Sequence, residues 1–316
     1  MRRILSFILL TFLFLSVQGQ ISRYPFYQIG SVGTATFILT YTGNGTGVTT
    51  IQFYVSDTTN MALDGNGYFY TDASGTLNKS QSWELYSGSL QTRYIRLESG
   101  TSNLVIDNPD NVIGWGYRSG STPYIGYSAA NNAPMIIGGS IEQFSPEVLQ
   151  YLFIGTGGNY NENGISGSLT GFTLLNTLRL GGGKMTGDIS NMTALEYIYI
   201  NSSYSSITGD FGINNVCDGI SVSFLLGTGC KITDYTIGGT WENVNITINP
   251  DTGYGLSSTE IDNMLIDMAA SQTLSGRTIT LQGSNAGRTS ASDDAVAILT
   301  TLNSGYTHAV NTVITN

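Results

Sequence analysis

The chain has 316 residues, of which 41% are hydrophobic and only 11% are charged, and its formal net charge is −10. Soluble globular chains normally carry about 25% charged residues, so solubility here depends on Gly, Ser, Thr, Asn and Tyr. That composition is typical of β-rich extracellular proteins. Long-range repulsion by an acidic protein excludes nucleic acid and anionic membranes as expected partners.

Residues 1–19 are predicted to be a secretory signal peptide. Arg2 and Arg3 precede an apolar run over residues 4–17, and the small residues that follow favour cleavage before Gln20. The alternative is a retained membrane anchor, but the run of about fourteen residues is shorter than the roughly 20 that span a bilayer. We therefore expect a secreted or cell-surface protein with no membrane span after cleavage.

The chain contains two cysteines, Cys217 and Cys230, and a single histidine, His308. In an exported protein, two cysteines this close in sequence predict a disulfide, which would stabilise the fold by roughly 3 kcal/mol through loop-closure entropy. The alternative is a pair of buried free thiols. With so few Cys and His residues, we expect no structural zinc site.

Residues 20–90 are predicted to be a β-rich N-terminal region. The segments 36–42 and 49–55 are rich in β-branched and aromatic residues, and Asn44-Gly45 between them is typical of a turn. The segments 67–71 and 82–86 continue this pattern without any amphipathic helical period.

Residues 91–250 contain an internal repeat with irregular first turns. A short motif, in which Ile or Met is followed by any residue, then Gly, then Asp or Ser, recurs along this segment. The glycine of each copy allows a bend that residues with a Cβ resist. The motif begins at Ile137, Ile165, Met185 and Ile207, a looser copy begins at Ile232, and the later spacings are 20, 22 and 25 residues. Strand-like L-x-x-L-x-L segments lie between the copies, at 149–154, 175–180 and 195–200.

This alternation of bends and apolar strands resembles the leucine-rich-repeat superfamily, whose repeats are about 20–29 residues long. The closest likeness is to the short-repeat type found in bacterial surface proteins and in phage tail or adhesion modules. The resemblance implies a short leucine-rich-repeat solenoid, because a single turn cannot bury its apolar face alone. It also implies a protein that attaches rather than reacts.

Residues 251–316 are predicted to form an α/β cap. Ser257 and Glu260 form a capping box at the start of a helix whose apolar residues follow at helical spacing. Residues 277–281 predict a strand, residues 290–302 a second helix and residues 309–315 a closing strand. The predicted fold class is therefore β-rich with an α/β cap: an N-terminal β region, a short leucine-rich-repeat solenoid and a C-terminal helix-strand-helix cap.

The sequence carries no catalytic signature, and we predict that the protein is not an enzyme. No nucleophile-elbow serine accompanies His308. Asp188 and Asp210 recur in successive repeats and are the candidate carboxylate pair for a carbohydrate-active enzyme. Ser140 and Ser168 occupy the same motif position, however, which favours turn hydrogen bonding for all four residues.

No cofactor is expected. The oxygen-rich loops at residues 64–66 and 107–111 leave calcium as a minor alternative. Neither loop matches an EF-hand, and ordinary turn chemistry explains both of them.

The residues between the core leucines of each strand are predicted to face outward and to bind a ligand. Exposed aromatic side chains accompanied by arginine are typical of binding sites, and aromatic faces also stack on sugars. In the alternative, a second layer or a partner subunit covers this strip. The strip consists of Tyr151 and Phe153, Thr177 and Arg179, and Tyr197 and Tyr199.

The predicted function is an exported binding or adhesion module that recognises a protein or glycan on a cell surface through the solenoid. Two alternatives stay open. One is a structural fibre or spike subunit that forms homo-oligomers, and the other is a carbohydrate-active enzyme that uses Asp188 and Asp210.

Overall fold

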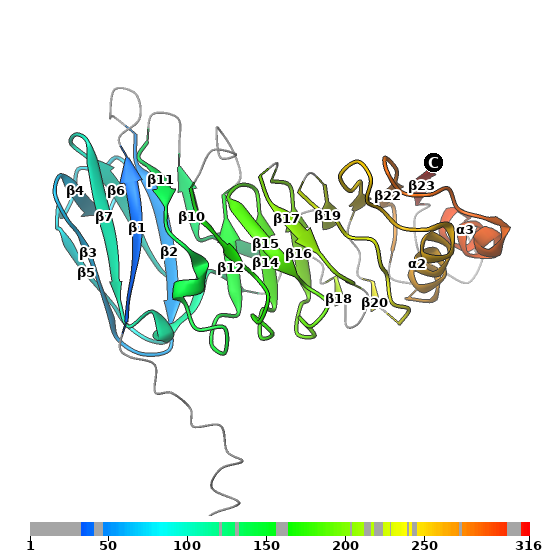
Figure 1. Ribbon diagram of the computed structural model, residues 1–316, viewed down its shortest axis with the longest axis horizontal. Coiled ribbons are helices and arrows are strands. Elements are labelled where there is room, and N and C mark those ends of the chain that lie inside the picture. Colours follow the sequence, from blue (N-terminus) through cyan, green and yellow to red (C-terminus); the bar gives the residue numbers. More distant parts are fainter. Residues whose placement is uncertain are drawn as a thin grey trace, which may run out of the picture. The chain divides into compact units, whose positions relative to one another are not determined.

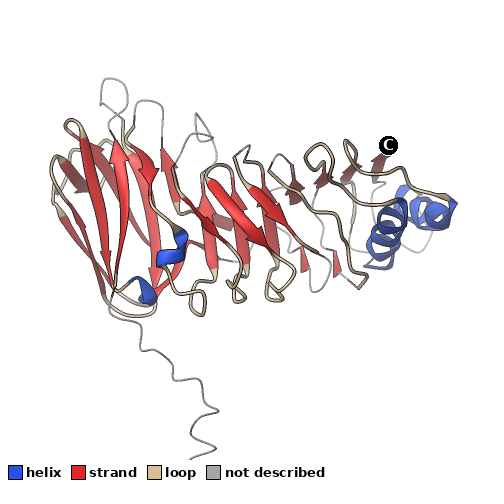
Figure 2. Cartoon of the chain, viewed as in Figure 1, coloured by secondary structure: helices blue, strands red, loops and turns tan. Residues whose placement is uncertain are grey.

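The structure is a computed structural model in which strands dominate the chain (Figures 1 and 2). Residues 34–316 form one compact unit, and the predicted signal peptide lies outside the described residues. The predicted boundaries at residues 90 and 250 both fall inside this unit. The described residues are 33–40, 47–119, 122–129, 133–155, 164–202, 204–211, 216–217, 224–227, 229–238, 240–241, 245–271, 274–301 and 311–316.

Five antiparallel strands form a first sheet, called the small sheet below. They are β1 (Thr34–Thr40), β3 (Thr59–Leu63), β5 (Ser82–Leu85), β7 (Thr101–Asp107) and β11 (Met135–Gly138). Their order is β11-β1-β7-β3-β5. Alternate residues of β1, namely Ala35, Phe37 and Leu39, are fully buried, because successive side chains of a strand point to opposite faces.

Thirteen strands form a second sheet, called the long sheet below. Its antiparallel part contains β2 (Thr49–Val55), β4 (Gly67–Tyr70), β6 (Gln91–Leu97), β8 (Val112–Ser119), β9 (Thr122–Ile125) and β10 (Tyr127–Ala129). Its parallel part contains β12 (Tyr151–Ile154), β14 (Thr177–Leu180), β16 (Tyr197–Ile200), β19 (Phe224–Leu226), β21 (Ile246–Ile248), β22 (Thr278–Leu281) and β23 (Thr312–Thr315). Apart from β8 and β9, the order is β23-β22-β21-β19-β16-β14-β12-β10-β2-β6-β4, and β10 to β19 can be followed side by side in Figure 1.

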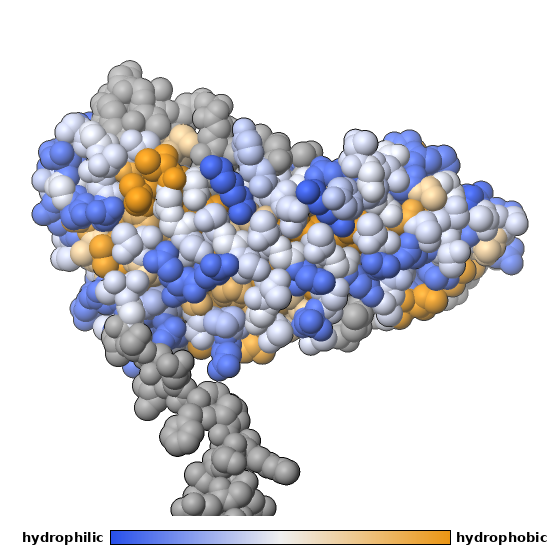
Figure 3. Space-filling model, viewed as in Figure 1, coloured by the Kyte–Doolittle hydropathy of each residue, from blue (hydrophilic) through white to orange (hydrophobic). Residues whose placement is uncertain are grey.

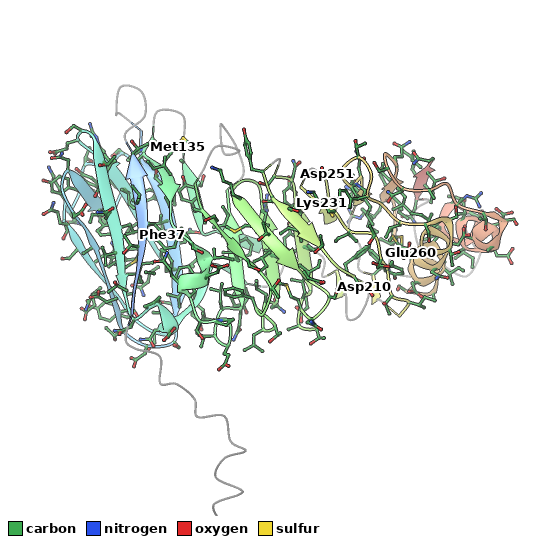
Figure 4. The ribbon with its side chains drawn as sticks, viewed as in Figure 1. Phe37, Met135, Asp210, Lys231, Asp251 and Glu260 are labelled. Carbon is green, nitrogen blue, oxygen red and sulfur yellow. The ribbon has the colours of Figure 1, made fainter. Side chains whose placement is uncertain are left out.

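An aromatic cluster joins the small sheet to the antiparallel part of the long sheet. Trp115 of β8 is fully buried, and its ring centroid lies 4.8 Å from that of Phe37 and 5.3 Å from that of Phe53. The indole Nε1 donates a hydrogen bond of 2.9 Å to the carbonyl oxygen of Gly126. Figure 4 shows Phe37 among the side chains of this core.

The repeats add a second strand on the opposite side of the core. The strands β13 (Ser166–Ser168), β15 (Lys184–Asp188) and β17 (Ser206–Thr208) form a short parallel sheet, and β18 (Val216–Cys217) pairs with β20 (Thr240–Trp241). Four of the five motif starts, Ile165, Met185, Ile207 and Ile232, are fully buried in the same core as the leucines of β14, whereas Ile137 is exposed. The motif glycines Gly139, Gly167, Gly187 and Gly209 have φ values of 130°, 127°, 123° and 112°, which residues with a Cβ rarely adopt.

Two α-helices lie in the described C-terminal part, α2 (Ser258–Ser271) and α3 (Asp293–Thr300). The predicted capping box at the start of α2 is confirmed. Ser257 N donates to Glu260 Oε2 at 2.7 Å, and Glu260 N donates to Ser257 Oγ at 3.3 Å. Short 3-10 helices cover Pro109–Asn111, Ile141–Gln143 and Ser290–Ser292.

The predicted fold class is wrong. The described chain is mostly β, in several sheets with two short α-helices, and is not a leucine-rich-repeat solenoid with a helix-strand-helix cap. Segments predicted as bends form strands of their own in the short parallel sheet, and β22 and β23 extend the long sheet instead of closing it with a cap. Apolar residues at alternate positions suit any buried strand, so their spacing alone did not specify how the sheets continue.

Candidate binding surface

The predicted binding residues lie on three adjacent strands of the long sheet, and the parallel pairing aligns them in two rows. Tyr151 of β12 pairs with Thr177 of β14, which pairs with Tyr197 of β16. The second row is Phe153, Arg179 and Tyr199. The leucines and isoleucines between them point to the core, so both rows occupy the opposite face. We call this the outer face of the long sheet.

The outer face is less exposed than the sequence predicted. Phe153, Thr177 and Tyr197 are buried, with exposed fractions of 0%, 0% and 3%. Tyr151, Arg179 and Tyr199 are half-buried. The structure therefore brings all six residues together but leaves only three of them partly accessible.

A hairpin formed by β8 and β9 lies next to β12. The first half of β8 pairs with both β2 and β12, and from Gly116 onward β8 pairs with β9 instead. The strand β9 contacts both β2 and β12. Leu152 of β12 pairs with Trp115 of β8, and Phe153 is the next residue along β12. Phe153 therefore lies beside Gly116, where β8 turns from β12 to pair with β9.

Arg179 and Tyr199 form the partly accessible centre of the outer face. The guanidinium carbon of Arg179 lies 4.8 Å from the centroid of the Tyr199 ring, a cation–π contact between directly paired residues. The Nε atom of Arg179 is buried and has no hydrogen-bond acceptor among the described residues. Stacking on the ring holds the guanidinium plane in place and limits the rotamers it can adopt.

Sequence reasoning missed that the N-terminal strands extend the same outer face. Tyr54 of β2 and Tyr151 of β12 both pair with Gly114 of β8, one on each side. On β6, Tyr94 and Arg96 are half-buried while Ile95 between them is buried, so these two side chains also face outward. The alternation in residues 49–55 and 91–97 could have revealed the outward residues. It could not show that these strands join the repeats in one sheet.

The motif carboxylates belong to a chain of hydrogen bonds that we call the turn ladder. Asp188 N donates to Thr170 Oγ1 at 3.2 Å, and Asp188 Oδ1 accepts from Ser190 N at 2.8 Å. Ser190 Oγ then accepts from Asp210 N at 2.9 Å. Hydrogen bonds to Ser190 lower the pKa of Asp188 below its usual value. The same ladder includes Ser140 Oγ with Glu142 N, Glu142 Oε1 with Ser168 N, Ser168 Oγ with Thr170 N, and Asp210 Oδ1 with Thr236 N.

The strand register also separates Asp188 from Asp210. Asp188 pairs with Thr208, two residues before Asp210, because the short parallel sheet is shifted relative to the sequence motif. Asp210 pairs instead with Asp234 and lies where the ladder reaches the last repeats (Figure 4). The two candidate carboxylates are therefore not paired across the short parallel sheet, and the observed geometry gives each of them a role in holding a turn.

The predicted disulfide between Cys217 and Cys230 is not formed, because Cys230 is a free cysteine. Its thiol is fully buried in the core, and burial raises its pKa to about 12. The backbone of Cys230 forms a bridge with Ile207, whereas Cys217 lies in β18 and pairs with Trp241 of β20. The two cysteines thus follow different strand pairings despite their proximity in sequence.

In the first of the two loops considered for calcium, the carboxylate has other hydrogen-bond partners. Asp64 accepts from the backbone N–H of Asn103 at 2.5 Å and from its side-chain amide at 2.6 Å, and the backbone bond is the main cause of a lowered pKa of Asp64. In the other loop, Asn108 adopts a left-handed conformation before a 3-10 helix. Within the described residues, His, Cys, Asp and Glu form no group of three or more that could hold a metal. His308 lies outside the described residues.

Asp262 is a buried carboxylate that connects the two α-helices. It accepts hydrogen bonds from Thr289 N at 3.0 Å and from Ser292 Oγ at 2.6 Å. Burial raises the pKa of Asp262, but the hydrogen bonds from Ser292 and Thr289 outweigh it, so the pKa lies below its usual value. This arrangement fixes the start of α3 against α2 and is structural.

Asp262→Asn is expected to lower the free energy of unfolding by about 2 kcal/mol at pH 7, because an amide cannot accept all of these hydrogen bonds. The carboxylate has a lower pKa in the folded than in the unfolded state, so its contribution is present above about pH 4 and is lost as the pH falls through the folded value. The difference between wild type and variant, measured by urea unfolding, should therefore shrink between pH 6 and pH 3. Asp294→Asn, an exposed change on α3, is the charge-matched control, and an equal pH dependence in both variants would contradict the prediction.

In the part of the chain that the structure describes, no helix is both long and apolar enough to cross a membrane. Comparisons with known proteins found no match, neither to a family model nor to a curated protein nor to a solved structure.

Proposed function

We propose that the chain is an exported, non-catalytic binding or adhesion module that contacts a protein or glycan on a cell surface. The outer face of the long sheet is the contact surface. One observation carries this proposal: Arg179 and Tyr199 form a stacked, partly accessible pair, flanked by further aromatic residues, on a strand array that holds them rigidly. Rigid aromatic and arginine side chains supply contact area at low entropic cost, which is why they dominate binding energies.

Two further observations support this function over a catalytic one and over an intracellular one. The carboxylates of Asp188 and Asp210 are both used as acceptors within the turn ladder. The charged start and apolar run of residues 1–19 support export.

The test is a binding screen of the purified protein on a glycan array and on whole cells. Arg179→Ala combined with Tyr199→Ala is the test variant, since Tyr197 is buried and its replacement would disturb the fold. Lys231→Ala combined with Tyr254→Ala is the matched control, because Lys231 stacks over Tyr254 at 5.3 Å elsewhere on the protein (Figure 4). We expect specific binding that falls at least about thirtyfold in the test variant, as for a hot-spot pair, and that is unchanged in the control.

A structural fibre or spike subunit is the second candidate, and an apolar patch on the small sheet favours it. Ile38 of β1 and Ile137 of β11 are 41% and 48% exposed, and Figure 3 shows apolar surface over these strands. The side chain of Ile38 lies against Gly138, next to Ile137. A protein that binds nothing in the screen but sediments as a stable trimer or larger oligomer would overturn the binding module in favour of this candidate.

A further inference from the structure

Arg179 has donors that the described protein leaves unused. A guanidinium offers five N–H donors, and it is always charged at physiological pH. Among the described residues, no carboxylate forms an ion pair with Arg179, and its buried Nε has no acceptor. By contrast, Lys79 pairs with Glu98 and Arg288 pairs with Asp293. Because the side chain of Arg179 is half-buried and no described residue accepts a hydrogen bond from it, its accessible terminal N–H groups are available to an acceptor that a ligand supplies.

The surroundings of Arg179 indicate what kind of acceptor fits. Its strand neighbours on the outer face are Phe153 on one side and Tyr199 on the other, so the guanidinium lies in a row of aromatic rings. The cation–π contact with Tyr199 limits the positions that the guanidinium can adopt. A planar, fixed guanidinium matches the two oxygens of a carboxylate, while an aromatic face such as that of Tyr199 or Tyr151 suits the apolar face of a sugar ring.

We propose that the ligand of the outer face is a saccharide with isolated carboxylate groups, one of which binds to Arg179. This inference rests on the proposed binding function and names its ligand class. The net charge of −10 works against ligands with dense negative charge, such as nucleic acids or polyphosphates. The net charge repels a single carboxylate next to Arg179 less strongly. At physiological ionic strength, salt largely screens charges that lie farther away than about 8 Å.

The experiment is a glycan array that presents uronic-acid and sialic-acid oligosaccharides, each beside its own carboxyl methyl ester, together with neutral oligosaccharides. The wild-type protein is expected to bind at least one acid at least about tenfold more tightly than its ester, as for a charge-assisted bidentate contact. Arg179→Gln preserves much of the side-chain volume and should abolish this preference for the acid. Lys231→Gln removes the same charge from a different cation–π pair, that of Lys231 with Tyr254, and should leave the preference intact.

The possible outcomes separate this inference from the proposed function. The carboxylate contact would be overturned if acids and esters bind equally, or if Arg179→Gln leaves saccharide binding unchanged. In either case the proposed binding function would still stand. If the chain binds a protein on cells and binds no saccharide, the saccharide inference would be overturned and the binding function would stand. A fully folded protein, as judged by circular dichroism, that binds neither saccharides nor cells would overturn the proposed function itself.

Discussion

Trp115→Ala is expected to lower the free energy of unfolding by about 3–5 kcal/mol, the usual cost of removing a large aromatic side chain from a core. Trp115 is fully buried and packs against Phe37, Phe53, Tyr127 and Phe144, with ring centroids 4.8 to 6.2 Å apart. It therefore contacts both sheets at the place where they share a core. Urea unfolding followed by circular dichroism measures the loss.

Trp115→Phe is the matched control for this prediction. It keeps an aromatic ring and removes the indole N–H that donates to Gly126 O. That carbonyl also accepts from Gln52 N at 2.7 Å, so it stays paired in both variants. We expect a loss of about 1–2 kcal/mol for Phe. If Trp115→Ala and Trp115→Phe lower the free energy of unfolding by the same small amount, the aromatic cluster does not hold the two sheets together.

Gly187→Ala is expected to cost at least about 3 kcal/mol, because two effects add: a backbone conformation that disfavours L-residues and a steric overlap. Gly187 has a φ of 123° in the Thr-Gly-Asp motif of its repeat. A Cβ there would lie 2.8 Å from the backbone nitrogens of both Leu169 and Thr170, which cannot move without breaking the neighbouring turn. The same urea measurement gives the loss in stability.

Gly171→Ala separates the two effects. Gly171 also has a positive φ, of 97°, but a Cβ there meets nothing within 4 Å. Its replacement should therefore cost only the backbone term of about 1–2 kcal/mol. Equal losses at the two glycines would show that the close approach between repeats contributes nothing to stability.

The site was only partly predictable. Alternation placed Arg179 and Tyr199 on the face away from the core, which is correct, because the side-chain direction in a strand is a local property. The sequence pattern did not predict that Phe153 is fully buried. It also did not predict that a hairpin more than twenty residues earlier in sequence lies beside β12, because that pairing joins segments far apart in the chain. The continuation of the outer face onto Tyr54 depends in the same way on the pairing of β2 with β8.

The sequence by itself determined the features that depend on neighbouring residues. These include the inward positions of the strands, the positive φ of the motif glycines and the capping box of Ser257 and Glu260. Only the tertiary structure decided how the strands combine: one long sheet from β4 to β23, and a shift that pairs Asp188 with Thr208. The tertiary structure likewise decided that Cys230 lies in the core, unbonded to Cys217. Local preferences follow from adjacent residues, whereas register and sheet order are set by contacts between residues far apart in the chain.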